Sequence, residues 1–192
     1  MKTIVVATDF SPSANRAADF AMQLAKAQHA SLILVHAFHC WPTNPADTGV
    51  DAVIGINTVL DVFQRELNHL AKKLKEHHGP DVPVRTVVRE GYAIPTIRDV
   101  AEDTKADLLV MATVGSAPQS AQLMGSIATS MVSETTVPLL LIPPLALYGD
   151  LKNVVLGIDL TVPPDAVVLN KSLQFARQFG CVVNILCIHN GP

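Results

Sequence analysis

The chain has 192 residues, of which 49% are hydrophobic and 16% charged, so it can form a packed core and is not expected to be disordered. Its net charge of −3 offers no basic surface for nucleic acid. No apolar run approaches the roughly 20 residues of a membrane-spanning helix, so we expect no membrane partner either. Three cysteines without a CxxC pair favour a reducing, cytoplasmic setting.

Predicted strands and helices alternate from the N-terminus onward. The apolar run Thr3–Thr8 predicts a buried strand that is followed by Asp9. Ser11 and Pro12 are typical of the start of a helix, as its N-cap and first residue. The apolar positions of that helix are mostly small: Ala14, Ala17, Ala18, Ala21, Leu24 and Ala25. A second strand is predicted over Leu32–Ala37.

The segment Phe38–Asn57 contains two X-Pro pairs and two glycines and predicts a long loop. Apolar residues spaced by three and four then predict a second helix that ends near His78, before Gly79-Pro80. The remaining predicted elements are a strand at Val84–Val88, a short helix around Pro95–Ala101, a strand at Asp107–Met111, a helix with the apolar face Ile127, Ala128, Met131 and Val132, and a strand at Val137–Ile142.

This alternation predicts an α/β fold, with a parallel sheet and helices on both faces. Ligands of such sheets bind outside the carboxyl ends of the strands. Asp9, Ala37 and the segment Met111–Ser126 all follow strand ends, so we expect them on the same side of the sheet.

The stretch Met111–Ser130 combines a strand, a loop of small residues and a helix start. Gly115 and Gly125 allow close approach and positive φ angles, and Ser126 adds a hydroxyl donor. Backbone N–H groups and a helix N-terminus in this arrangement can bind an anion. The same pattern is also consistent with a purely structural loop.

A sequence repeat divides the chain. Residues Lys2–Asp9 (KTIVVATD) recur as Lys152–Asp159 (KNVVLGID) and are again followed by a helical and a strand pattern. We therefore expect a first domain at 1–142, a linker at 143–150, and a partial second β-α-β unit at 151–192. An isolated unit of about 40 residues cannot form a stable core. This second unit would either dock on residues 1–142, pair with its copy in another chain or stay mobile, and we favour pairing.

The first domain resembles the universal stress protein family. The family's loop pattern is Gly, two residues, Gly, nine residues, Gly, then Ser or Thr. Here Ala112 stands at the first Gly, Gly115 at the second, and Gly125-Ser126 close the pattern. The stretches VATDFSPSA and SLILVHAF also resemble the family, and residues 151–192 resemble an incomplete tandem copy.

The resemblance implies an open five-stranded parallel sheet of the Rossmann-like, adenine nucleotide α-hydrolase-like type, a cytoplasmic role in stress response, and dimerisation. It implies an adenine nucleotide (ATP, ADP or AMP) as the ligand, and ATP, with or without Mg²⁺, as the cofactor. Asp9 would lie near the adenosine, and Ala37 would meet adenine through its backbone. The phosphates would be surrounded by the loop residues Ala112, Gly115, Ser116, Gly125 and Ser126.

No Lys or Arg lies in the loop, so we expect weak nucleotide binding and at most slow ATP hydrolysis. The alternative is a dimerising interaction protein of the same family that binds no nucleotide. An enzyme of the wider fold is disfavoured because the loop after the first strand lacks phosphate-binding glycines. Asp9 can equally be a catalytic carboxylate or a cap at the end of the strand. His36, His39 and Cys40 have no second ligand cluster that would predict a metal site.

Overall fold

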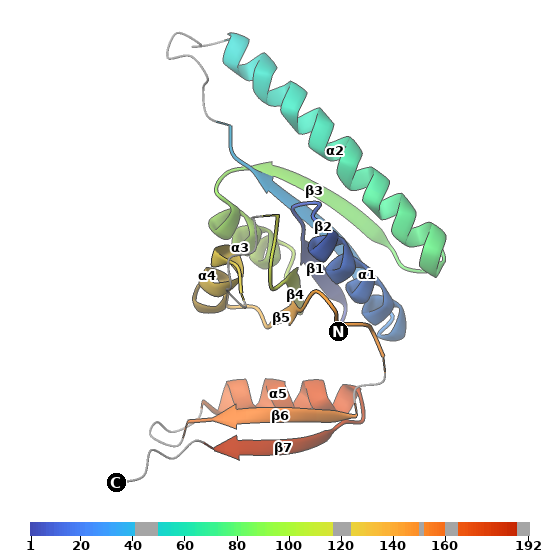
Figure 1. The fold of residues 1–192 in the computed structure, drawn as a ribbon, viewed down its shortest axis with the longest axis vertical. Helices are drawn as coiled ribbons and strands as arrows, with labels where there is room; N and C mark the ends of the chain where they lie inside the picture. Colours follow the sequence, from blue (N-terminus) through green and yellow to red (C-terminus); the bar gives the residue numbers. More distant parts are fainter. Residues whose placement is uncertain (41–49, 117–123, 150–151, 160–164, 188–192) are drawn as a thin grey trace. The chain divides into compact units, whose positions relative to one another are not determined.

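The structure, a computed structural model, describes residues 1–40, 50–116, 124–149, 152–159 and 165–187. Seven strands and five helices lie within these residues (Figure 1). In chain order they are β1 (Thr3–Ala7), α1 (Pro12–Ala27), β2 (Ser31–Phe38), α2 (Val50–His78), β3 (Val84–Glu90), α3 (Ala93–Asp103), β4 (Leu108–Ala112), α4 (Ser126–Glu134), β5 (Leu139–Ile142), β6 (Asn153–Ile158), α5 (Ala166–Gln178) and β7 (Val182–Cys187).

The first five strands form one parallel sheet in the order β3-β2-β1-β4-β5. This confirms the predicted fold class. The chain builds outward from β1 through β2 to β3, and then crosses back to place β4 on the other side of β1. The connections after β1 and β4 therefore leave the sheet in opposite directions, which makes the carboxyl ends of these two strands the topological switch point.

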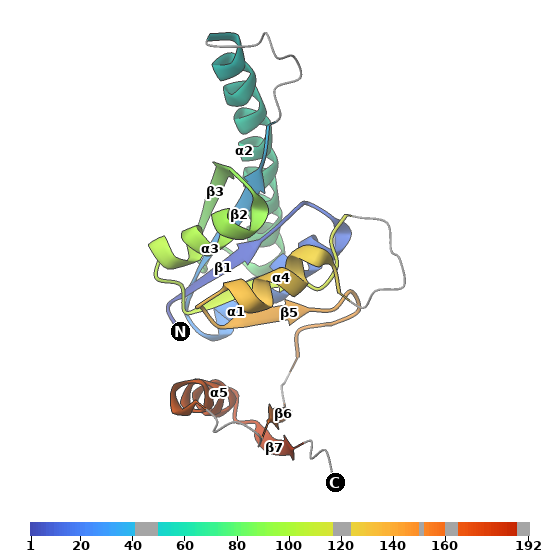
Figure 2. The ribbon, with the colours of Figure 1, turned by 90° about the vertical axis from the view of Figure 1, so that its left-hand side faces the viewer.

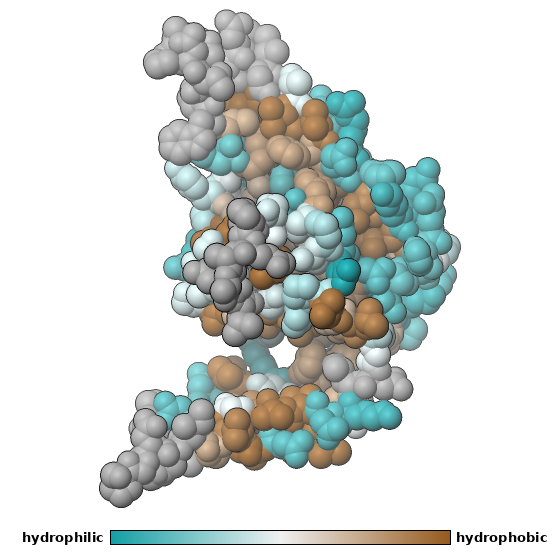
Figure 3. Space-filling model, in the orientation of Figure 1, coloured by the Kyte–Doolittle hydropathy of each residue, from teal (hydrophilic) through white to brown (hydrophobic). Residues whose placement is uncertain are grey.

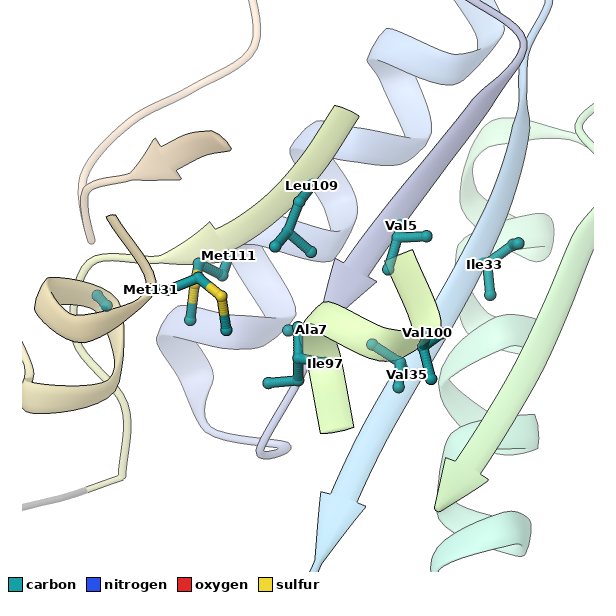
Figure 4. Packing of buried hydrophobic residues seen from close by; sticks show 10 residues of the cluster. Val5, Ala7, Ile33, Val35, Ile97, Val100, Leu109, Met111 and Met131 are labelled. Atoms are coloured by element: carbon teal, nitrogen blue, oxygen red, sulfur yellow. The ribbon is translucent and has the colours of Figure 1, made fainter. Parts of the chain in front are cut away.

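Helices cover both faces of this sheet. Figures 1 and 2 show α1 and α2 on one face and α3 and α4 on the other. The core beneath α3 and α4 is drawn in Figure 4, where Val5, Val35 and Leu109 of the strands meet Val100 and Met131 of the helices. The alanines of α1 are buried as predicted, and their small side chains let that helix lie close to the sheet.

Hydrogen bonds to two side chains fix the start of α1 and the start of β1. The Ser11 hydroxyl accepts a hydrogen bond from the Ala14 N–H at 3.1 Å, so Ser11 is the N-cap of α1 as predicted. At the opposite end of β1, the Asp107 carboxylate accepts from the N–H groups of Lys2 and Thr3 at 2.6 and 3.0 Å. This carboxylate ties the start of β4 to the start of β1.

The predicted loop Phe38–Asn57 is wrong over residues 50–57, which form the first turns of α2. Phe38 is also the last residue of β2, and residues 41–49 lie outside the described part of the chain. Gly55 and Asn57 weaken the local helix signal, but the spacing of Ile56, Leu60 and Phe63 continues the apolar stripe of α2. A long helix that packs against the sheet overrides such local preferences.

The predicted apolar face of α4 is half wrong. Ala128 and Met131 are 3% and 0% exposed, whereas Ile127 is 43% and Val132 is 58% exposed. The helix has only nine residues, and Ala128 and Met131, three positions apart, form the narrow stripe that packs against the sheet. Ile127 and Val132 lie on either side of that stripe.

Contacts divide the chain into two units, Met1–Leu147 and Tyr148–Pro192. In the second unit β6 and β7 pair in parallel, from Asn153↔Val182 to Ile158↔Cys187, and the Asp165 carboxylate caps α5. Apolar surface gathers on this unit in Figure 3. Val155, Val182 and Leu186 are each more than half exposed, and the register of the two strands puts them on the same face of the pair. Over the described ranges, no helix is both long enough and apolar enough to cross a membrane.

The orientation of α4 can be tested with two neighbouring residues. We expect Met131→Ala to lower the free energy of unfolding by about 2–5 kcal/mol, because it leaves a cavity in the core. Val132→Ala, the matched control on the exposed side, should change it by no more than about 0.5 kcal/mol. Urea denaturation followed by circular dichroism measures both, and equal losses would contradict this packing.

Candidate functional site

Most of the predicted site residues gather at the carboxyl edge of the sheet. Asp9 lies two residues beyond β1, Ala112 ends β4, and Ala37 is the penultimate residue of β2. Ala37 is paired with Arg89 of β3, and its partly buried side chain packs against the core under α3. The structure thus places Asp9 and Ala112 at the switch point itself and Ala37 one strand away.

The Asp9 carboxylate joins the connections that leave β1 and β4. Its Oδ1 atom accepts a hydrogen bond from the Ser11 N–H at 3.0 Å, and its Oδ2 atom accepts one from the Ser116 N–H at 2.8 Å. Gly115 makes this approach possible, because a Cβ atom built on it would lie only 2.6 Å from Asp9 Oδ2. Asp9 therefore closes the gap between two loops that diverge from the sheet.

The surroundings of Asp9 keep its carboxyl ionised. Partial burial raises the pKa of this carboxyl, but the hydrogen bonds from Ser11 and Ser116 together outweigh burial and hold the pKa below its ordinary value. The result is a negative charge at the switch point that is bound by backbone N–H groups of its own chain.

The second half of the loop leads into α4. The Gly125 N–H donates to the Thr113 carbonyl at 2.7 Å, which brings the start of α4 back beside the end of β4. Gly125 is the N-cap of α4, makes no side-chain cap, and is followed by the exposed Ser126 as the first helical residue. Residues 117–123 of the predicted loop lie outside the described part of the chain.

The expected positive φ at the loop glycines is wrong for both Gly115 and Gly125, and the φ of Gly125 is −71°. The positive φ angles of the described glycines lie at Gly79, Gly91 and Gly180. Gly125 instead takes an ordinary extended N-cap conformation, and a Cβ atom there would be 3.5 Å from its nearest neighbour. Of the two loop glycines, Gly115 is the one whose missing side chain is required by a close contact.

Sequence reasoning missed Phe10, which follows Asp9. Phe10 has a φ of +62°, a left-handed conformation that is strained for a bulky residue. Its N–H donates to Thr8 Oγ1 at 3.0 Å, and its ring lies 4.5 Å from the ring of His36 and 6.1 Å from that of Phe63. These contacts hold the tight turn that aims Asp9, and no local sequence pattern distinguishes such a turn.

His36 belongs to this aromatic cluster, with its ring 4.5 Å from that of Phe10 and 4.4 Å from that of Phe63. Its Nδ1 atom lies 2.8 Å from the Thr8 carbonyl, and its buried Nε2 atom has no hydrogen-bond partner in the described chain. Burial lowers the pKa of His36, although the Thr8 carbonyl and the Asp9 charge oppose this, so the ring is neutral at pH 7. His39 stacks on Tyr92 instead, and no group of three possible metal ligands occurs in the described ranges.

An open parallel sheet with its polar loops at the switch point defines a Rossmann-like α/β protein. The sequence model of the universal stress protein family matches residues 1–143, and the chain belongs to that family. Universal stress protein Rv1636 of Mycobacterium tuberculosis is 31% identical over 144 residues, which make up 73% of this chain and 95% of that protein.

Solved structures of universal stress proteins have the same fold as residues of the first unit. The universal stress protein UspA from Lactobacillus plantarum has a TM-score of 0.57 at 20% identity and covers 73% of this chain and 97% of its own, which supports the fold. A universal stress protein solved in complex with cAMP has a TM-score of 0.54 at 27% identity and covers 73% of this chain and 96% of its own.

Serine substitutions at the two loop glycines test the geometry around Asp9. Gly115→Ser pushes the Asp9 carboxylate away from the Ser116 N–H, so we expect it to lower the free energy of unfolding by about 1 kcal/mol or more. Gly125→Ser is the matched control: its Cβ fits, and serine is a better N-cap than glycine, so stability should hold or rise. Urea denaturation distinguishes the two, and a larger loss at Gly125 would refute this account of the loop.

Proposed function

We propose that this chain is a stress-response regulator that binds an adenine nucleotide at the carboxyl ends of β1, β2 and β4. The observation that carries the proposal is the convergence of three features at the switch point: the ionised Asp9, the close turn at Gly115-Ser116, and the uncapped N-terminus of α4. The relative solved in complex with cAMP supports an adenine nucleotide as the ligand.

The residues of the site have separate roles in this proposal. Asp9 lies on the adenosine side, where it fixes the turn after β1 against which the nucleoside lies. The backbone of Ala37 meets the edge of the adenine ring. The phosphate side is formed by the β4–α4 connection, with the residues Ala112, Gly115, Ser116, Gly125 and Ser126. The free N–H groups and dipole of α4 favour an anion there, and the Ser126 hydroxyl adds a donor.

Charge sets the expected affinity. No Lys or Arg occurs between Lys105 and Ile142, so phosphate charge is met only by dipoles and hydroxyl groups, or by Mg²⁺ bound together with ATP. This favours weak binding and small phosphate groups over tight binding of a triphosphate. The same lack of an arginine or an acid positioned for water leaves ATP hydrolysis slow, below about 1 per second.

One observation favours a second function. Both oxygens of the Asp9 carboxylate are bound by N–H groups of the chain itself, and Ala112 adds a methyl group at the first position of the loop pattern. A site whose polar groups are already satisfied needs no ligand. The alternative is therefore a dimerising interaction protein of the same family that binds no nucleotide.

Titration calorimetry of the full chain with cAMP, AMP and ATP–Mg²⁺ separates the two functions. We expect dissociation constants within about the millimolar range for adenine nucleotides, and no heat with GMP. Ser126→Ala should weaken binding several-fold, because it removes a donor at the start of α4. Ser133→Ala, at the far end of the same helix, is the matched control and should not. Absence of heat with every adenine nucleotide at millimolar concentration would contradict nucleotide binding and support the dimerising interaction protein instead.

A further inference from the structure

The outer edge of β3 carries unpaired backbone groups. β3 is an edge of the five-stranded sheet, and among the described strands it pairs only with β2. The ladder starts with the Leu32 N–H donating to the Pro83 carbonyl and ends with the Gly91 N–H donating to the Phe38 carbonyl. Because alternate residues of a parallel strand bond to a given neighbour, the N–H and C=O groups of Val84, Thr86 and Val88 point away from β2.

A groove of about 510 Å³ lies along the same edge, between β3 and α2. Ala71, Pro80 and Val84 give it an apolar lining, and Thr86 and Asn68 add polar atoms. Thr86 Oγ1 donates to Asn68 Oδ1 at 2.8 Å, so the two elements are held together beside the groove. An extended chain laid along β3 would therefore place alternate side chains over this lining.

The lining of the groove carries a net positive charge, from Lys72 and Lys75 against Glu76. The lining includes Lys72 and Lys75 of α2, and the exposed Arg85 lies on the opposite face of β3. Glu76 also lines the groove, where it pairs with Lys72 at 3.7 Å, an exposed pair of the kind that contributes little. Within the described ranges, Lys75 and Arg85 form no ion pair, and Asp81 lies in the turn before the strand.

We propose that the β3 edge and its groove bind an extended acidic segment of another protein, which adds to the sheet as a further strand. The segment's backbone would bond to Val84, Thr86 and Val88. On the groove side, its side chains would place a carboxylate at Lys75 and a small apolar residue over Val84, and on the other side a carboxylate would reach Arg85. Main-chain bonds supply affinity in this mode and alternate side-chain contacts supply selectivity. A second copy of β3 is disfavoured as the occupant because it would bring arginines and lysines together.

Peptide binding to the full chain tests the proposal. A fluorescein-labelled peptide of about eight residues with the repeat Glu-Val-Glu-Glu, which carries Glu on both faces of a strand and Val on one face, should bind, as measured by fluorescence polarisation, and the matched peptide with the repeat Lys-Val-Lys-Lys should not. We expect Lys75→Glu to weaken binding about tenfold or more. Lys73→Glu is the matched control, since it changes the same charge on the same helix outside the groove, and it should weaken binding less than about twofold.

Two further measurements locate the peptide. Only one edge of an added strand bonds to β3, so the amides of alternate peptide residues face β3 and the others face away. N-methylation of the first set should abolish binding, and N-methylation of the second set should not. Amide resonances of Val84, Thr86 and Val88 should shift on binding. No binding of the acidic peptide, equal losses at Lys73 and Lys75, or concentration-dependent self-association that Lys75→Glu removes would overturn the proposal.

Discussion

The carboxylate of Asp9 bridges the two connections that leave the sheet at its switch point. β1 and β4 are neighbours, but the chain leaves them in opposite directions, so backbone N–H groups face a gap there. Asp9 fills that gap with hydrogen bonds to Ser11 and Ser116, and the missing side chain of Gly115 lets it reach. The shape of the candidate site depends on this bridge.

Aromatic packing around Phe10 supports this bridge. The turn that presents Asp9 needs a left-handed residue, and that residue is Phe10, whose ring is held against His36 and Phe63. Phe63 belongs to α2, so this long helix reaches the candidate nucleotide site through ring contacts. The neutral His36 fits such a setting, since a protonated ring would be buried without a second hydrogen-bond partner.

Local pattern predicts the elements of this fold but not the contacts between them. Apolar runs and capping residues identify β1, α1 and the parallel sheet, because burial on both faces and the Ser11-Pro12 start are properties of neighbouring residues. The reach of α2 and the exposure of Val132 depend on packing against other elements. The hydrogen bond from Ser116 to Asp9 spans 107 residues, and nothing near either residue encodes it.

An acid titration of the full chain by NMR, which follows the amide protons of Ser11 and Ser116, tests the bridge most directly. The lowered pKa of Asp9 means that its contribution to stability is complete above about pH 4 and is lost as the pH falls through the folded-state value. Both amides should therefore shift together with one midpoint below the ordinary Asp value, and Asp9→Asn should remove the transition from both. If the Ser116 amide does not follow Asp9, or the common midpoint lies at or above that ordinary value, the bridge does not exist as described.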